Sequence, residues 1–292
     1  MTSLLTKTPF DLQTWQWQGN SIQFTALGSG QPLMLLHGFG ASIGHWRNNI
    51  PALAAAGYRV YALDLLGFGG SDKPDRPYKM ELWQELVEAF WQDNIGQPTV
   101  IVGNSIGGLL TLMLLAKAPG IAKGGILLNP AGGLNHRPEE LNLPLRFVLG
   151  NFAKVVQLPG IGTWLFNRIR QKSNIRRSLR QVYCNSAAVT EELVELIYRP
   201  SCDPGAQQVF AAILRAEAGP HPTELLPHIH QPLLILWGEA DPWTPITGAK
   251  CYQYYHDQVE LISLPNTGHC PHDECPDRVN TLILDWLERQ SF

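Results

Sequence analysis

The hydrophobic pattern of the chain changes after about residue 30. Before that point TWQWQG and SIQFTALG alternate apolar with polar residues, which predicts two short antiparallel strands forming a hairpin at a sheet edge. Afterwards the apolar residues form continuous runs that end at Gly, Pro or Asn, a pattern typical of parallel strands buried on both faces. These runs are residues 32–38, 58–66, 99–105 and 124–131.

Helical stretches are expected at 43–56, 81–94 and 106–117, between the apolar runs. The pattern then stops and resumes with two further strand-like runs and a final helix, at 232–242, 259–265 and 272–289. The sequence therefore predicts an α/β fold with a mostly parallel, doubly wound sheet and an N-terminal antiparallel hairpin. We expect a core of residues 1–133 and 221–292 and a helical cap, residues 134–220, inserted after the sixth strand.

Composition narrows the class of protein. Of the 292 residues, 45% are hydrophobic and 16% charged, the balance of a globular protein. The formal charge of −3 argues against nucleic acid as a general partner. No run approaches the roughly 18 apolar residues of a membrane-spanning helix, and the start does not resemble a signal peptide. These features predict a cytoplasmic protein.

The sharpest local motif is Gly103-Asn104-Ser105-Ile106-Gly107, placed where a predicted strand ends and a helix begins. A nucleophile on such a turn needs a positive φ angle, and side chains two positions to either side would collide with the neighbouring strand or helix. The helix N-terminus also favours negative charge that develops near the hydroxyl. The context therefore indicates a nucleophilic serine at 105.

A serine hydroxyl is nearly inert at neutral pH, so this interpretation requires a base and a residue that orients the base. Asp241 follows the strand LLILWGE, and His269 follows the strand VELISLP. Loops after parallel strands share one edge of the sheet, so we expect Ser105, Asp241 and His269 to converge there.

Rivals fit these roles less well. Glu239 lies closer to the strand end than Asp241, and position 129, another place for the acid, is Asn. Residues 272–274 are interpreted as the capped first turn of the last helix. Three other histidines do not follow a strand exit: His228, His230 and His256.

An oxyanion hole needs two backbone donors, predicted here as the N–H groups of Ile106 and Phe39. Phe39 lies in His37-Gly38-Phe39-Gly40, which could equally be an ordinary glycine-rich turn. Position 43 is Ile where a dinucleotide fingerprint needs a third glycine, and neither GxxxxGK[ST] nor HExxH occurs. We therefore predict no cofactor and no metal.

Several motifs together resemble the α/β-hydrolase superfamily over nearly the whole chain. They are HGFG, DLLGFGGSDKP, GNSIGG, WGEADPWTP and GHCPHDECP. GNSIGG, EADPW and GHCPHDECPDRVN further resemble pheophytinase and related chlorophyll dephytylases, which hydrolyse the phytyl ester of chlorophyll-type pigments. The resemblance implies a triad of Ser105, Asp241 and His269. A serine nucleophile also speaks against the epoxide hydrolases and haloalkane dehalogenases of the superfamily, which use a carboxylate.

The predicted cap has an asymmetric charge. Between Glu140 and Glu191 there is no acidic residue, whereas basic residues interleave with aromatic and aliphatic ones. Two explanations are open: a solvated face of cap helices, or a surface that rests on an anionic membrane and admits an apolar substrate. The basic residues are Arg146, Lys154, Arg168, Arg170, Lys172, Arg176, Arg177 and Arg180.

Taken together, the sequence predicts a carboxylic ester hydrolase that acts on a small lipophilic ester, such as the phytyl ester of pheophytin or chlorophyll. In the cell it would be cytoplasmic, or peripheral to an internal photosynthetic membrane. Two alternatives share the triad chemistry: a C–C bond hydrolase and a cofactor-free perhydrolase. A third is a non-catalytic receptor or scaffold on the same fold.

Overall fold

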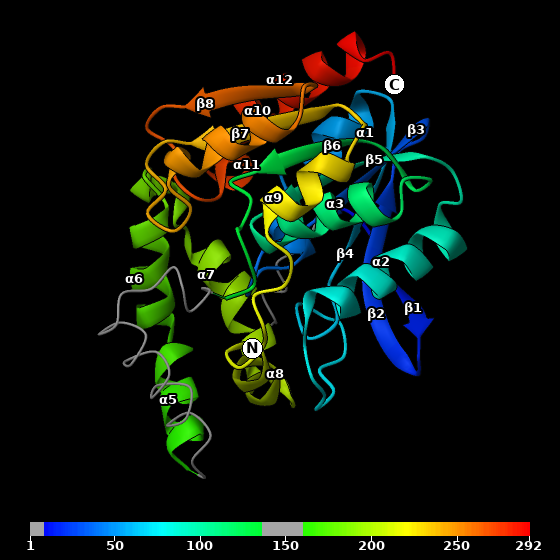
Figure 1. Ribbon diagram of the computed structural model, residues 1–292. Helices are drawn as coiled ribbons and strands as arrows, with labels where there is room; N and C mark the ends of the chain where they lie inside the picture. Colours follow the sequence, from blue (N-terminus) through cyan, green and yellow to red (C-terminus); the bar gives the residue numbers. More distant parts are fainter. Residues whose placement is uncertain (1–8, 136–159) are drawn as a thin grey trace.

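An eight-stranded sheet forms the centre of the molecule (Figure 1). The computed structural model describes residues 9–135 and 160–292. The strand order is β1-β2-β4-β3-β5-β6-β7-β8; β1 pairs antiparallel with β2, β2 pairs antiparallel with β4, and all other pairs are parallel. The strands are β1 (Gln13–Trp17), β2 (Asn20–Leu27), β3 (Gln31–Leu36), β4 (Tyr58–Leu63), β5 (Thr99–Asn104), β6 (Ala122–Leu128), β7 (Leu233–Gly238) and β8 (Val259–Leu264).

Both faces of the central parallel strands β3, β5, β6 and β7 are buried, as their continuous apolar runs predict, whereas the edge strand β8 is only partly buried. In β3, Met34 and Leu36 belong to one core cluster and Leu33 and Leu35 to the other, because side chains alternate along a strand. The first cluster is covered by α2 (Met80–Asn94), α3 (Ile106–Lys117), α9 (Pro222–Leu225) and α10 (Lys250–Tyr255). The second is covered by α1 (Ile50–Ala55) and α12 (Pro276–Arg289). The predicted fold class is confirmed.

Two predicted helices are each divided. The stretch 43–56 forms a 3₁₀ turn, η1 (Ile43–Trp46), followed by α1, because Pro51 has no N–H to continue the hydrogen-bond ladder. The stretch 272–289 forms α11 (Pro271–Glu274) and α12, because Pro276 disfavours a helical conformation at Cys275, whose φ is −138°. Residues 272–274 are therefore not the first turn of the last helix, and that interpretation was wrong.

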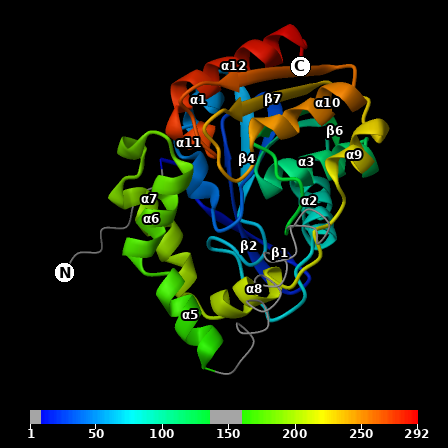
Figure 2. The same ribbon diagram turned by 60° about the vertical axis from the view of Figure 1, so that its left-hand side comes forward.

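Helices between β6 and β7 form a cap beyond the carboxyl end of the parallel strands (Figures 1 and 2). Of the predicted cap, residues 136–159 lie outside the described part of the chain, so its bounds at 134 and 220 stay a prediction. The described cap helices are α5 (Ile161–Ile169), α6 (Lys172–Val182), α7 (Glu191–Tyr198) and α8 (Ala206–Ile213). Short 3₁₀ turns are η3 (Ser186–Ala188), η4 (Pro200–Cys202), η5 (Leu226–His228) and, after β7, η6 (Ile246–Ala249).

Candidate active site

Ser105 lies on a sharp turn between β5 and α3, with φ 55° and ψ −119°. Left-handed φ is costly for a residue with a Cβ and persists only where the surroundings impose it. Glycines on both sides permit the turn: a Cβ on Gly103 would lie 2.1 Å from the carbonyl oxygen of Gly107, and one on Gly107 would lie 2.2 Å from that of Leu36. Close packing therefore explains why positions 103 and 107 are glycine, as predicted from the sequence.

The structure brings Ser105 and His269 together in one cavity of about 260 Å³ beneath the cap. Ser105 follows β5 and His269 follows β8, and all parallel strands end at the same edge of the sheet. The hydroxyl of Ser105 makes no hydrogen bond to His269 within the described residues. Such contacts are often long before substrate binds, so this geometry is compatible with a nucleophile and its base.

Asp241 lies behind His269 and orients its ring. The Asp241 Oδ2 lies 2.6 Å from His269 Nδ1, and the carboxylate is only 4% exposed. The same oxygen accepts hydrogen bonds from Asn129 Nδ2 at 2.7 Å and from the Thr244 hydroxyl. Oδ1 accepts from the backbone N–H groups of Trp243 and Thr244. Burial raises the pKa of Asp241, but the hydrogen bonds from His269, Thr244 and Trp243 outweigh it, so this pKa lies below its usual value.

The rival acid, Glu239, is exposed, and among the described residues its carboxylate forms no hydrogen bond or ion pair with His269. Asn129, by contrast, has a function that its sequence position only hinted at. Its Oδ1 accepts the N–H of Gly238 at 2.9 Å, which fixes the amide so that its Nδ2 faces Asp241. The end of β6 therefore supplies a hydrogen-bond donor to the carboxylate instead of the carboxylate itself.

The predicted oxyanion donors belong to residues near Ser105. Phe39 lines the cavity, and Ile106 is the first residue of α3. Among the described residues neither backbone N–H has a hydrogen-bond acceptor, so both remain available to a ligand. Gly38 permits this approach, because a Cβ there would lie 3.2 Å from the Cβ of Ser105.

His37 holds the loop that carries Phe39. Its Nδ1 donates to the carbonyl of Gly38 at 2.8 Å, and its Nε2 accepts the N–H of Leu65 at 3.0 Å. Burial lowers the pKa of His37 to about 4, so the ring stays neutral and keeps both hydrogen bonds. The HGFG loop is therefore held in place by the two hydrogen bonds of His37, which has a structural role.

Polar residues that the sequence analysis did not assign hold the loop of His269 in place. Asn104 donates through Nδ2 to the carbonyl of His269 at 2.9 Å, and the N–H of His269 donates to the carbonyl of Val182 in α6 at 2.8 Å. Glu274 accepts the N–H of Gly268 at 2.9 Å. The loop of His269 is thus hydrogen-bonded both to the turn that carries Ser105 and to the cap.

A second tie runs from the cap through Asp273. The hydroxyl of Tyr183, which follows α6, donates to Asp273 Oδ2 at 2.7 Å, and Arg47 pairs with Oδ1 at 2.7 Å. The acidic pair Asp273-Glu274, four and five residues after His269 in GHCPHDE, was the sequence signal for these supports.

Two further searches cover residues 9–135 and 160–292. No group of three or more His, Cys, Asp or Glu side chains there could hold a metal ion. No helix in the same ranges has both the length and the apolarity to cross a membrane.

Comparison with known proteins places the chain in a family. A profile described as alpha/beta hydrolase family matches residues 33–282. The chloroplastic pheophytinase of Arabidopsis thaliana is 26% identical over 302 residues, which cover 88% of this chain but 61% of that longer protein. The 2-hydroxymuconate semialdehyde hydrolase of Pseudomonas sp. (strain CF600) is 27% identical over 273 residues, 89% of this chain and 88% of that one. A crystal structure of a serine hydrolase involved in carbazole degradation superposes with a TM-score of 0.78 at 22% identity, covering 96% of this chain and 99% of the other.

Proposed function

We propose that this protein, which belongs to the alpha/beta hydrolase family, is a serine hydrolase that cleaves a carboxylic ester of a lipophilic alcohol. One observation carries the proposal. A serine with strained left-handed φ shares a cavity with a histidine whose Nδ1 is 2.6 Å from a buried carboxylate. A nucleophile on a sharp turn, a nearby base and a residue that orients the base form the arrangement that nucleophilic catalysis by serine uses.

The mechanism follows from these positions. Asp241 accepts the Nδ1–H of His269, which leaves Nε2 free to take the proton of Ser105 as its Oγ attacks the ester carbonyl carbon. The oxyanion that forms accepts hydrogen bonds from the N–H groups of Phe39 and Ile106. His269 then protonates the departing alcohol. Water, deprotonated by His269, attacks the acyl-enzyme and releases the acid and free Ser105.

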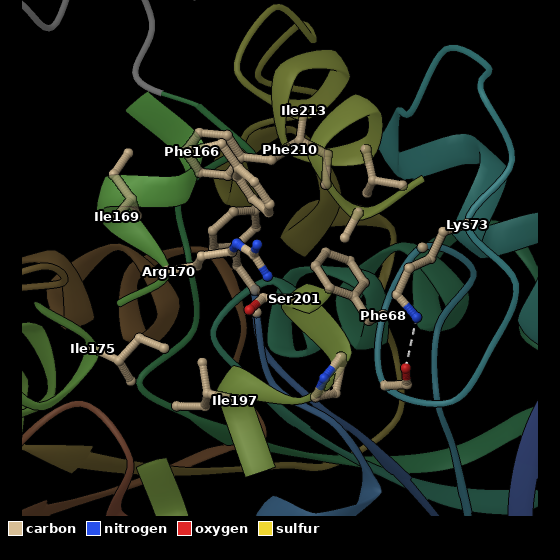
Figure 3. A pocket seen from close by; sticks show the side chains of 17 residues that line it. Phe68, Lys73, Phe166, Ile169, Arg170, Ile175, Ile197, Ser201, Phe210 and Ile213 are labelled. Atoms are coloured by element: carbon tan, nitrogen blue, oxygen red, sulfur yellow. Dashed lines mark hydrogen bonds between the residues drawn. The ribbon is translucent and has the colours of Figure 1, made fainter. Parts of the chain in front are cut away.

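The shape and polarity of the neighbouring space support an apolar substrate. A second cavity, of about 150 Å³, adjoins the active-site cavity, and Phe39, Ile169 and Ile197 line both. Figure 3 shows aromatic and aliphatic side chains around this second cavity, among them Phe68 and Phe210. Burying an alkyl chain there contributes about 0.8 kcal/mol per CH₂ group.

The similarity to pheophytinase supports a narrower choice within this class, the phytyl ester of a chlorophyll-type pigment. A wide hollow shares Phe39 and Trp243 with the lining of the active-site cavity, and it would receive the ring system of such a pigment while the phytyl chain occupies the apolar cavities. Trp243 is 57% exposed and its ring lies 5.3 Å from that of His269, where it can stack on a flat ligand.

A substrate panel tests both levels of the proposal. It spans short aryl esters, long-chain esters and pheophytin or chlorophyll, with the released alcohol measured. Ser105→Ala should abolish turnover and fluorophosphonate labelling while the protein stays folded; Ser263→Ala, an exposed serine of β8, is the matched control and should keep both. Turnover retained by Ser105→Ala would refute the triad.

The two-cavity substrate site is tested separately. Ile197→Phe narrows the junction of the two apolar cavities, so it should lower kcat/KM for long-chain esters more than for short ones. Equal losses for both would contradict the placement of the chain.

The similarity to 2-hydroxymuconate semialdehyde hydrolase favours a second candidate, hydrolysis of a C–C bond by the same triad. Product analysis distinguishes them: an ester releases an alcohol and an acid, whereas a diketone-type substrate releases two carbonyl-containing fragments and no alcohol.

A further inference from the structure

The cationic side chains of α5 and α6 fall into two groups. Lys172 and Arg176 pair with Glu195 and Glu191 of α7, which neutralises the side of α6 that faces α7. Three arginines are exposed and form no ion pair with any described residue: Arg168, Arg177 and Arg180. The sequence has no Asp or Glu from 141 to 190, so this part of the chain contributes only positive charge.

Two of these arginines line a shallow, open hollow of about 260 Å³ between α5 and α6. The hollow is also lined by Asn174, Ser178 and Gln181, side chains that donate N–H or O–H hydrogen bonds. Guanidinium forks surrounded by neutral donors match the oxygen atoms of a phosphate group.

This hollow adjoins the active-site cavity. Ile169 and Ser178 line both the hollow and the cavity that holds Ser105 and His269. Ile169 lines the second apolar cavity as well, and it is labelled at the edge of that cavity in Figure 3. A ligand that approaches over the arginines therefore meets the entrance to the site.

Exposed apolar side chains stand beside the arginines. Trp164 is 66% exposed and Ile161 44%, both on α5, which lies at the outer end of the cap, away from the sheet (Figures 1 and 2). Trp164 and Arg168 are four residues apart and so share one face of the helix. Tryptophan with neighbouring arginines is the pairing found where proteins meet the boundary between lipid headgroups and acyl chains. A soluble anion would use the arginines but gain nothing from the apolar side chains.

We propose that the exposed face of α5 and α6 docks on an anionic phospholipid bilayer. Trp164 enters the interface, and Arg168 and Arg177 hold a headgroup phosphate in the hollow. A lipophilic ester then passes from the bilayer along Ile169 into the cavity beside Ser105. The delivery of an ester substrate from the bilayer rests on the proposed function, whereas the docking on the bilayer does not.

Vesicle flotation tests the docking without any reaction. The probes are phosphatidylcholine vesicles alone and the same vesicles with 30 mol% phosphatidylglycerol, on the order of a typical anionic bilayer surface. The protein should float with the anionic vesicles and not with the neutral ones, and binding should fall as salt is raised. Each basic side chain at an anionic surface contributes about fivefold to partitioning, so Arg168→Glu/Arg177→Glu should lower it by at least about 25-fold.

The matched control reverses two exposed charges outside the cap, Lys117→Glu/Arg278→Glu, with the same change in net charge. It should keep most of the binding, and Trp164→Ala should lose binding without any change in charge. Equal recovery with neutral and anionic vesicles, no recovery with either, or equal losses in the two double variants would overturn the proposal. Melting temperatures show that each variant is folded, and turnover of a soluble aryl ester by the unaltered protein reports separately on the triad.

Discussion

Replacing Asp241 by Asn isolates the orienting role of the carboxylate. The two side chains have the same shape, but one carboxylate oxygen becomes an NH₂ group. Oδ1 accepts two backbone N–H groups, from Trp243 and Thr244, so the remaining oxygen of Asn stays there. The NH₂ group then faces His269 Nδ1, which must become the acceptor, and the ring proton moves to Nε2.

A histidine protonated at Nε2 cannot take the proton of Ser105. Loss of the correct tautomer in a triad costs about 10⁴-fold in kcat, or ~5 kcal/mol of transition-state stabilisation. Stability should fall too, because the new NH₂ group also faces the NH₂ of Asn129, which is fixed by its bond to Gly238. One buried donor left unpaired costs about 1–3 kcal/mol, which lowers Tm by several degrees.

The assay is kcat on a soluble aryl ester together with Tm. Thr244→Val is the matched control, because it removes another hydrogen bond to the same Asp241 oxygen without changing the His269 tautomer. It should lose far less activity than Asp241→Asn, within about tenfold, on the scale of one lost hydrogen bond. Asp241→Asn activity within tenfold of the unaltered protein would refute the role of Asp241.

Two further predictions concern buried polar residues in the lining of the active-site cavity. Tyr183→Phe removes a donor to the buried carboxylate of Asp273, so the free energy of unfolding should fall by about 1–3 kcal/mol; an unchanged Tm in calorimetry would contradict this. Burial lowers the pKa of His45 to about 4, against a usual value near 6.5, so His45 is neutral in both the folded and the unfolded chain above pH 6.5. Between pH 6.5 and 4 the unfolded chain binds a proton at His45 that the folded chain does not, so the free energy of unfolding falls as pH drops toward 4. His45→Phe should therefore have the same free energy of unfolding as the unaltered protein at pH 7. Between pH 7 and pH 4, denaturant unfolding should show that the variant loses about 3 kcal/mol less of this free energy than the unaltered protein does. Parallel pH profiles of the two proteins would show that His45 does not titrate as inferred.

The positions fixed by short-range rules could be predicted from the sequence. Strands buried on both faces appear as continuous apolar runs, and the glycines around Ser105 record a turn that tolerates no Cβ at those positions. The chain order of Ser105, Asp241 and His269, each after a parallel strand, was enough to place them at one edge of the sheet. These constraints involve only a few consecutive residues, or the single fact that parallel strands point the same way.

Only the tertiary structure decided which side chains support those three. Asn129 reaches Asp241 across 112 positions, and Asn104 reaches the carbonyl of His269 across 165. The cap joins this network through Tyr183, and the arginines of α5 and α6 were separated into paired and unpaired groups by how α6 packs on α7. Such contacts depend on strand order and helix packing, which no local periodicity encodes. The sequence thus determined the fold class and the candidate chemistry. The long-range packing decided which side chains hold the candidate site in place and which arginines of the cap are exposed without an ion pair to a described residue.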